Sequence, residues 1–237
     1  MNTFLEEVLA KAKYDPKKVE VVVAPTDLHL TTAQSKLSKT NVHVAAQDVS
    51  QYGRGAYTGN ITADQLTDAK IEWTLTGHSE RRSLFGESDQ DVALKTKVAL
   101  ENGLNVMLCI GESLEERESG KTGKVNARQL QAVVDEITEG QWGNVVVAYE
   151  PVWAIGTGKV ATPEQAQETH AEIRDWLAAN VSSKVAGATR ILYGGSVNGA
   201  NCADLISNQD IDGFLVGGAS LKPEFKDIIE AADKDKK

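Results

Sequence analysis

The chain has 237 residues, 41% of them hydrophobic, and a formal net charge of −9. This acidity argues against nucleic acid as a partner, although one local positive site still permits a phosphorylated substrate. No apolar run approaches the ~20 residues of a membrane span, and the opening Met1–Lys13 resembles neither a signal nor a transit peptide. The cysteines, Cys109 and Cys202, fit a reducing compartment, so we expect a cytoplasmic protein, with an organellar form as the alternative.

Helix and strand patterns alternate along the chain without a linker. Helices are predicted at Thr3–Tyr14, Gln90–Glu101, Asn126–Thr138 and Pro163–Asn180, the last with Thr162 as N-cap. Short, non-alternating apolar runs between the helical patterns predict parallel strands that are buried on both faces. These runs are Val19–Ala24, Val42–Ala46, Trp73–Thr76, Asn105–Ile110, Val145–Tyr149, Arg190–Tyr193 and Gly213–Val216.

Repeated βαβ units of this kind form either a closed barrel or an open doubly wound sheet. The length favours a barrel, an α/β fold that runs as one domain, here over residues 1–237. The patterns predict seven strands but eight helices, because the chain opens on a helix. A (β/α)8 barrel that begins in this way lacks its first strand.

A carboxylate ends the apolar run Val145–Tyr149. Glu150 is followed by Pro151 and by a small-residue loop that contains Gly156 and Gly158. This layout is typical of a catalytic base on a rigid strand beside a hinged lid that excludes water from the substrate. The alternative is that Glu150 forms one half of a structural ion pair.

A histidine follows the strand Trp73–Thr76, within the run Gly77–Arg82. The carboxyl end of a strand faces the catalytic end of a barrel. A helix N-terminus disfavours imidazolium there, so a neutral His78 can act as a hydrogen-bond donor. The alternative is a histidine satisfied in the core. The remaining histidines lack this context and are interpreted as structural or surface residues: His29, His43 and His170.

Two glycine pairs each end an apolar strand, in the runs Tyr193–Ser196 and Val216–Ser220. Glycine lets backbone amides approach an oxyanion at a helix N-terminus. In barrels the usual phosphate site lies after the seventh and eighth strands. Together the two pairs predict a phosphate-binding site.

The segment Ala148–Lys159, together with Gly77–Arg82, resembles the active-site glutamate, mobile loop and histidine motif of the triosephosphate isomerase family. The resemblance implies a TIM (β/α)8 barrel that interconverts dihydroxyacetone phosphate and glyceraldehyde 3-phosphate through an enediolate, without cofactor or metal. It implies that Glu150 is the base and that His78 polarises the carbonyl oxygens. The other residues that it implicates are Gly156, Ser196, Gly217 and Gly218 for phosphate; Ser79, Glu80 and Cys109 in support; Pro151, Val152, Trp153, Lys159, Val160 and Ala161 as lid hinges; and Gln47 and Thr58 in a dimerisation loop. The implied partners are a phosphorylated triose and a second copy of the chain, or a larger assembly.

The chain departs from the family pattern at its start, where the first strand and its Asn-x-Lys motif have no counterpart. We therefore expect Val19–Ala24 and Gly213–Val216 to remain unpaired with each other, and the chain as given to have little or no activity. Three readings stay open: an isomerase that lacks its N-terminus, a non-catalytic relative within a larger assembly, and another phosphate-binding barrel enzyme. The third reading does not account for the run Glu150–Lys159.

Overall fold

The structure is a computed structural model that describes residues 9, 12–154 and 161–235. Most of the helix expected at Thr3–Tyr14 lies outside these residues, as do Gly156, Lys159 and Val160 of the expected lid. No helix among the described residues is long and apolar enough to cross a membrane.

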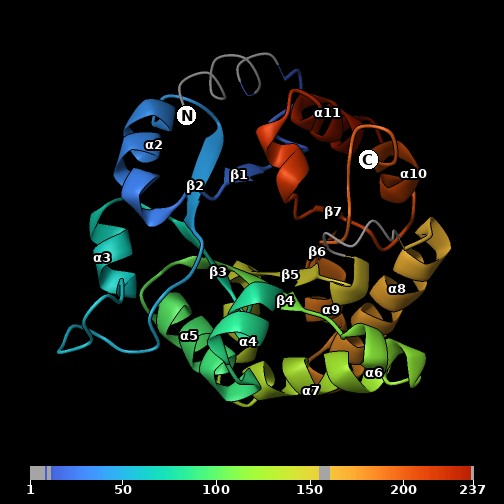
Figure 1. Ribbon diagram of the computed structural model, residues 1–237, viewed down its shortest axis with the longest axis horizontal. Helices are drawn as coiled ribbons and strands as arrows, with labels where there is room; N and C mark the ends of the chain where they lie inside the picture. Colours follow the sequence, from blue (N-terminus) through green and yellow to red (C-terminus); the bar gives the residue numbers. More distant parts are fainter. Residues whose placement is uncertain (1–8, 10–11, 155–160, 236–237) are drawn as a thin grey trace.

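Seven parallel strands form one sheet in which every strand lies beside its neighbours in sequence. The sheet curls, and the helices lie outside it (Figure 1). All seven expected strands are found, several shortened at their ends. They are β1 (Val21–Val23), β2 (Val42–Ala46), β3 (Trp73–Thr76), β4 (Asn105–Ile110), β5 (Val145–Tyr149), β6 (Ile191–Tyr193) and β7 (Gly213–Phe214).

Both faces of the sheet are buried, as the apolar runs predict. One face packs against the helices in the main core, to which β5 contributes Val145, Val147 and Tyr149. The alternate residues, Val146 and Ala148 in β5, join a smaller cluster inside the curl. Side chains therefore fill both surfaces of each strand, which explains the lack of alternating polarity.

Helices connect successive strands. The α-helices are α2 (Leu30–Leu37), α3 (Ala63–Asp68), α4 (Ser79–Phe85), α5 (Asp89–Glu101), α6 (Leu114–Glu118), α7 (Thr122–Val134), α8 (Pro163–Asn180), α9 (Ser183–Ala188), α10 (Cys202–Ile206) and α11 (Phe225–Asp235). Short 3-10 turns are η2 (Asp27–His29), η3 (Glu139–Asn144), η4 (Val152–Ala154) and η5 (Gly218–Leu221).

Three connections contain two helices each, so the described helical segments outnumber those expected. Gly86, with φ of 71°, ends α4, and Gly120, with φ of 68°, lies between α6 and α7. Glycine accepts this left-handed conformation without the steric cost of a Cβ. The helix predicted at Asn126–Thr138 was wrong in its bounds, because α7 spans Thr122–Val134 and Thr138 instead caps η3 through a capping box with Gln141.

The sheet ends at β1 and β7. Within the described residues β1 pairs only with β2, and β7 pairs only with β6. The expectation that these two strands do not pair directly is therefore confirmed for the part of the chain that the structure describes.

Candidate active site

Glu150 lies at the carboxyl end of β5, where the sheet fixes its backbone on both sides. Its N–H donates to Ile110 O at 2.7 Å, and Gly194 N–H donates to Tyr149 O at 2.7 Å. A Cβ on Gly111 would lie 1.7 Å from Glu150 O, so only glycine permits this approach of the two strand ends. The backbone that carries the carboxylate is therefore rigid.

The Glu150 side chain is buried, with 2% of the residue exposed. Its Oε2 accepts a hydrogen bond from Ser79 N–H at 2.9 Å, and its Oε1 lies 3.1 Å from His78 Nε2. Burial raises the pKa of Glu150, while His78, the Ser79 amide and Cys109 act in the opposite direction. The carboxyl group is thus closer to accepting a proton near neutral pH than an ordinary glutamate.

His78 caps the N-terminus of α4 with its own side chain. Its Nδ1 accepts from Glu80 N–H at 3.3 Å, so in the neutral ring the proton lies on Nε2, which faces Glu150. The His78 side chain keeps 27% of its surface exposed, whereas that of Glu150 keeps 3%. The pair therefore joins a partly exposed imidazole to a buried carboxyl group.

Arg82 connects the end of β3 to the end of β4 by hydrogen bonds. Its Nε donates to Gly77 O at 2.8 Å, its Nη2 to Cys109 O at 3.2 Å and its Nη1 to Asp89 at 2.7 Å. Gly77 has φ of 70°, and a Cβ there would lie 2.7 Å from Val92 Cγ1 and 2.8 Å from Arg82 Nη2. Gly77 and Arg82 thus fix the backbone that leads into His78.

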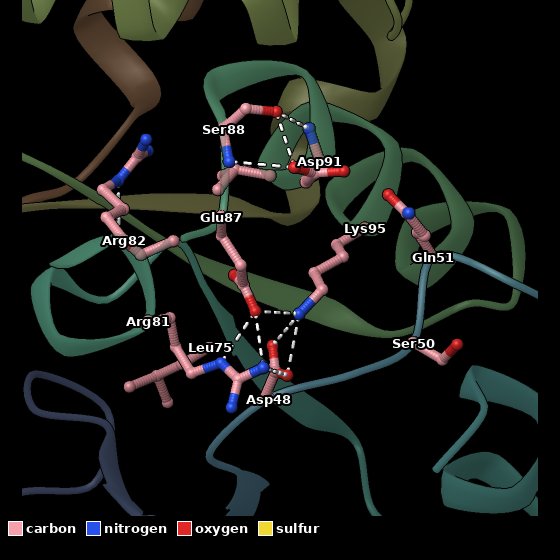
Figure 2. Close-up of polar contacts among 12 residues, drawn as sticks. Asp48, Ser50, Gln51, Leu75, Arg81, Arg82, Glu87, Ser88, Asp91 and Lys95 are labelled. Atoms are coloured by element: carbon pink, nitrogen blue, oxygen red, sulfur yellow. Dashed lines mark hydrogen bonds and ion pairs between the residues drawn. The ribbon is translucent and has the colours of Figure 1, made fainter. Parts of the chain in front are cut away.

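An ion-pair cluster anchors α4 to the loop after β2 (Figure 2). Lys95 Nζ contacts both carboxylate oxygens of Asp48 at 2.7 Å and Glu87 Oε1 at 2.5 Å. Arg81 adds contacts to Glu87 at 2.6 Å and to Asp48 at 3.2 Å. Since Arg81 lies one turn after His78, this cluster limits the movement of the helix that the histidine caps.

Glu112 is a functional candidate that sequence reasoning missed. It is fully buried and accepts hydrogen bonds from Tyr149 Oη and Trp153 Nε1, each at 3.0 Å, and from Arg117 Nη1 at 3.1 Å. The Arg117 guanidinium also lies 4.7 Å from the Trp153 ring centroid. Its position two residues after β4 was the available signal, because a charged residue at a strand end needs a partner. Glu112 thus holds the segment that is expected to form the N-terminal hinge of a lid.

The other expected hinge residues lie around this contact. Pro151 is buried, and Val152 N–H donates to Glu112 O at 3.2 Å. Ala161, the described part of the second hinge, is buried in the main core. The expected first hinge is therefore held by both the side chain and the backbone of Glu112.

The expected phosphate residues follow β6 and β7. Ser196 Oγ donates to Ala154 O at 2.6 Å, which links the loop after β6 to η4, where the first hinge is expected. A Cβ on Gly195 would meet Tyr193 Oη at 2.2 Å, so glycine is required there. Gly217 and Gly218 are exposed and have open space where a Cβ would lie. Their backbone is accessible at the same end of the sheet as Glu150.

The remaining candidates divide into buried and exposed positions. Cys109 is fully buried, and burial raises the pKa of its thiol, with Glu150 adding to the shift. Gln47 donates to Ala24 O at 2.9 Å. Glu80 and Thr58 are exposed, Thr58 within the loop between β2 and α3. The described residues contain no group of three or more His, Cys, Asp or Glu side chains placed to hold a metal ion.

The other histidines lie away from this arrangement. His29 is exposed, and His43 pairs with Glu72 at 2.8 Å. His170 is fully buried, and its ring packs edge-on against that of Tyr149. None of them reaches the contact between His78 and Glu150.

Comparison with known proteins adds an independent line of observation. A family model described as triosephosphate isomerase matches residues 1–232. Triosephosphate isomerase of Coprinopsis cinerea is 60% identical over 227 residues, covering 96% of this chain and 90% of the relative. The Neurospora crassa enzyme of that name is 59% identical over 223 residues, covering 94% and 89%. Cytosolic triosephosphate isomerase of Oryza sativa subsp. japonica is 57% identical over 214 residues, covering 90% and 83%.

Proposed function

Because the chain belongs to the triosephosphate isomerase family, we propose that it interconverts dihydroxyacetone phosphate and glyceraldehyde 3-phosphate. The reaction moves a proton between two neighbouring carbons of the triose through an enediolate. It therefore needs a base, a group that stabilises charge on oxygen, and a pocket for the phosphate.

We assign the base to Glu150. A base that acts near neutral pH works best when its pKa approaches that pH, and burial moves Glu150 in that direction. Both of its oxygens contact protein groups, Ser79 N–H and His78 Nε2. The carboxylate must therefore exchange at least one of these contacts to reach a substrate carbon.

We assign the stabilisation of the enediolate to His78. Its Nε2 carries the proton in the tautomer that accepts from Glu80 N–H, and it lies beside the Glu150 carboxylate. A neutral imidazole in this position donates a hydrogen bond to a carbonyl oxygen as negative charge develops there. One residue then takes the carbon-bound proton while the other stabilises the adjacent oxygen.

We assign phosphate binding to the exposed backbone at Gly217 and Gly218 and to Ser196, with Gly156 contributing from the lid outside the described residues. Backbone N–H groups bind an oxyanion without a competing side-chain charge. The bond from Ser196 to Ala154 O couples the phosphate loop to the hinge that Glu112 holds. Binding of phosphate and movement of the lid are therefore linked.

The observation that carries this proposal is the buried contact of Glu150 Oε1 with His78 Nε2 at 3.1 Å, at the carboxyl ends of two strands of one sheet. The test is an isomerase assay of the chain as it exists, beside Glu150→Gln and Glu150→Asp. Loss of the base should lower kcat by ~10²–10⁴. Glu118→Gln, which removes an exposed glutamate of α6, is the matched control and should leave kcat unchanged.

Equal turnover of the parent chain and Glu150→Gln would refute the assignment of the base. A parent chain that binds a phosphonate analogue of the triose but shows no turnover would instead support the non-catalytic alternative. Failure to bind the analogue at millimolar concentration, in a folded sample, would contradict both.

We also propose that two copies of the chain associate through the loop after β2 and through α4. Tyr52 and Tyr57 stack in that loop with ring centroids 4.3 Å apart, and they keep 44% and 42% exposure. Leu84 and Phe85 on α4 are exposed at 75% and 66%. Light scattering should give the mass of a dimer, and Phe85→Glu should shift the measured mass toward that of the monomer.

A cytoplasmic location is proposed from the named cytosolic relative.

A further inference from the structure

Helix α4 is short, and the direction of the His78 ring depends on it. The helix has seven residues, of which only Ser79 is buried. A helix of this length is not stable by itself, because isolated helices shorter than about 12–15 residues are marginal in water. Side-chain contacts therefore set the direction of α4. The His78 ring follows that direction, since His78 is the N-cap of the helix.

Arg82 holds the start of α4, and the ion-pair cluster holds its end. The C-cap, Gly86, is followed directly by Glu87, whose N–H donates to Arg81 O at 3.2 Å. Glu87 Oε1 accepts from Arg81 Nε at 2.7 Å and lies 2.5 Å from Lys95 Nζ. Glu87 Oε2 is buried and has no hydrogen-bond partner among the described residues. The loss of a cation beside Oε1 would therefore release the end of α4.

Lys95 is a buried cation whose three N–H groups are matched by three carboxylate oxygens. Its side chain is 8% exposed and comes from the middle of α5. The oxygens are Asp48 Oδ1 and Oδ2, each at 2.7 Å, and Glu87 Oε1 at 2.5 Å. An ammonium group has three donors, so all of them have a partner here. The packing of α5 and oxygens from two other segments together fix the position of Nζ.

Lys95 thus joins three segments of the fold at one point, as Figure 2 shows. Asp48 follows the end of β2 by two residues, Glu87 follows α4, and Lys95 belongs to α5. Arg81 completes the cluster with its contacts to both carboxylates, so that two cations face two anions. Without Lys95, two carboxylates would face one guanidinium, and their repulsion would move α4 away from β2.

We propose that Lys95 is a positioning residue: it fixes α4 relative to β2, and through α4 it fixes the direction of His78 Nε2. This inference rests on the role assigned above to His78 in the isomerase reaction. His78 Nε2 lies 3.1 Å from Glu150 Oε1, and a tilt of α4 changes this contact. A displacement of about 1 Å can lower a rate about 10²-fold. The proposed phosphate contacts lie on other segments, so the effect should appear in kcat rather than in KM.

The principal test variant combines Glu87→Gln with Lys95→Met. It removes one charge of each sign, so Asp48 and Arg81 remain as a balanced pair. We expect kcat to fall roughly tenfold to a hundredfold while KM stays nearly unchanged. Lys95→Arg keeps the cation and should retain most of the parental kcat. Glu87→Gln alone weakens the link between Lys95 and α4 with the least change to the core, and it should lower kcat in the same direction.

Lys97→Met is the matched control. Lys97 lies two positions further along α5, and its ammonium pairs with Glu136 at 3.0 Å, beyond the end of α7. This variant removes a lysine from the same helix but leaves the cluster intact, so it should keep the kcat of the parent chain. Equal losses in Lys97→Met and in the double variant would overturn the proposal, because they would show a general effect of α5.

A second measurement does not depend on turnover. The proton on His78 Nε2 faces Glu150, and its NMR chemical shift reports the strength of that hydrogen bond in the substrate-free chain. We expect the same downfield signal in the parent chain and in Lys97→Met. In the double variant the signal should move upfield or disappear through exchange with water.

A folded double variant with parental kcat and an unchanged Nε2–H signal would overturn the proposal. A parent chain without turnover would contradict the proposed isomerase reaction, and the Nε2–H signal alone would then decide whether Lys95 positions His78. Thermal melts establish that each variant is folded. If the double variant does not fold, the same two measurements on Glu87→Gln decide the outcome.

Discussion

His170 should make the folded state sensitive to acid. It is fully buried, its Nδ1 donates to the carbonyl oxygen of Asp210 at 3.1 Å, and its Nε2 has no hydrogen-bond partner among the described residues. Burial lowers the pKa of His170 from 6.5 to about 4, although Asp210 and Asp212 act in the opposite direction. A proton added at Nε2 would sit in the core without an acceptor.

The direction of this pH dependence follows from the number of protons that His170 binds in the folded and in the unfolded state. Between pH 6.5 and about 4 the unfolded histidine is protonated and the folded one is neutral, so the unfolded state binds more protons. Stability therefore rises with pH across this window and is lost as the pH falls. Each unit of pKa shift corresponds to ~1.4 kcal/mol, so the loss is on the order of 3 kcal/mol by pH 4.

The assay is urea unfolding of the parent chain and of His170→Phe at several pH values from 7 to 4. Phenylalanine keeps an aromatic ring against Tyr149, whose ring centroid lies 5.7 Å away, but it cannot titrate. Subtracting the unfolding free energy of the variant from that of the parent chain at each pH removes the contributions of the other titratable groups. The parent should lose about 1.4 kcal/mol per pH unit relative to the variant below pH 6.5. Parallel profiles, or an NMR titration of His170 with a midpoint near 6.5, would refute this reasoning.

Three further predictions concern stability. Glu112→Ala removes a fully buried acceptor of hydrogen bonds from the buried Tyr149 Oη and from the half-buried Trp153 and Arg117, and we expect a loss of about 3–5 kcal/mol in the free energy of unfolding, measured in urea. Gly77→Ala places a Cβ against Val92 and Arg82 at φ of 70°, and we expect a loss of roughly 2–4 kcal/mol by thermal melting together with lower activity. Asn126→Leu should raise the free energy of unfolding by about 1–2 kcal/mol, because it replaces an amide that lacks partners with an apolar group.

Two of these predictions have a matched control within the chain. Gly103→Ala shares the positive φ of Gly77 but has open space at its Cβ, so it should cost only about 1 kcal/mol; equal costs would show that packing around Gly77 is irrelevant. Glu118→Ala removes an exposed glutamate six positions after Glu112 in the sequence, and an equal loss in that variant would exclude a special role for the contacts of Glu112. A destabilised Asn126→Leu would indicate that the amide is satisfied by a buried water.

The sequence alone determined the elements and the end of the sheet at which the candidate site lies. Apolar runs of limited length can bury both faces only in a parallel sheet covered by helices, so β1 to β7 were predictable in number, type and order. His78 and Glu150 were predictable as candidates because each directly follows such a run. Helix bounds were predictable where a local cap exists, as at Thr162 before α8, and not at α7, which begins without a side-chain cap.

Only the tertiary structure decided which of these residues meet. His78 and Glu150 meet because the register of β3, β4 and β5 places the ends of β3 and β5 close together. The burial that raises the pKa of Glu150 depends on the curl of the whole sheet. Glu112 holds Trp153 because two strand ends lie side by side, although the residues are 41 positions apart. His170 and Asn126 are ordinary helical residues in sequence. Only the packing of α8 and α7 against their neighbours buries His170 Nε2 and the Asn126 side-chain amide without hydrogen-bond partners among the described residues. The pattern of apolar residues along a chain indicates which face of an element is buried. The desolvation and the hydrogen bonding of a particular side chain depend on atoms that the fold brings from distant parts of the sequence.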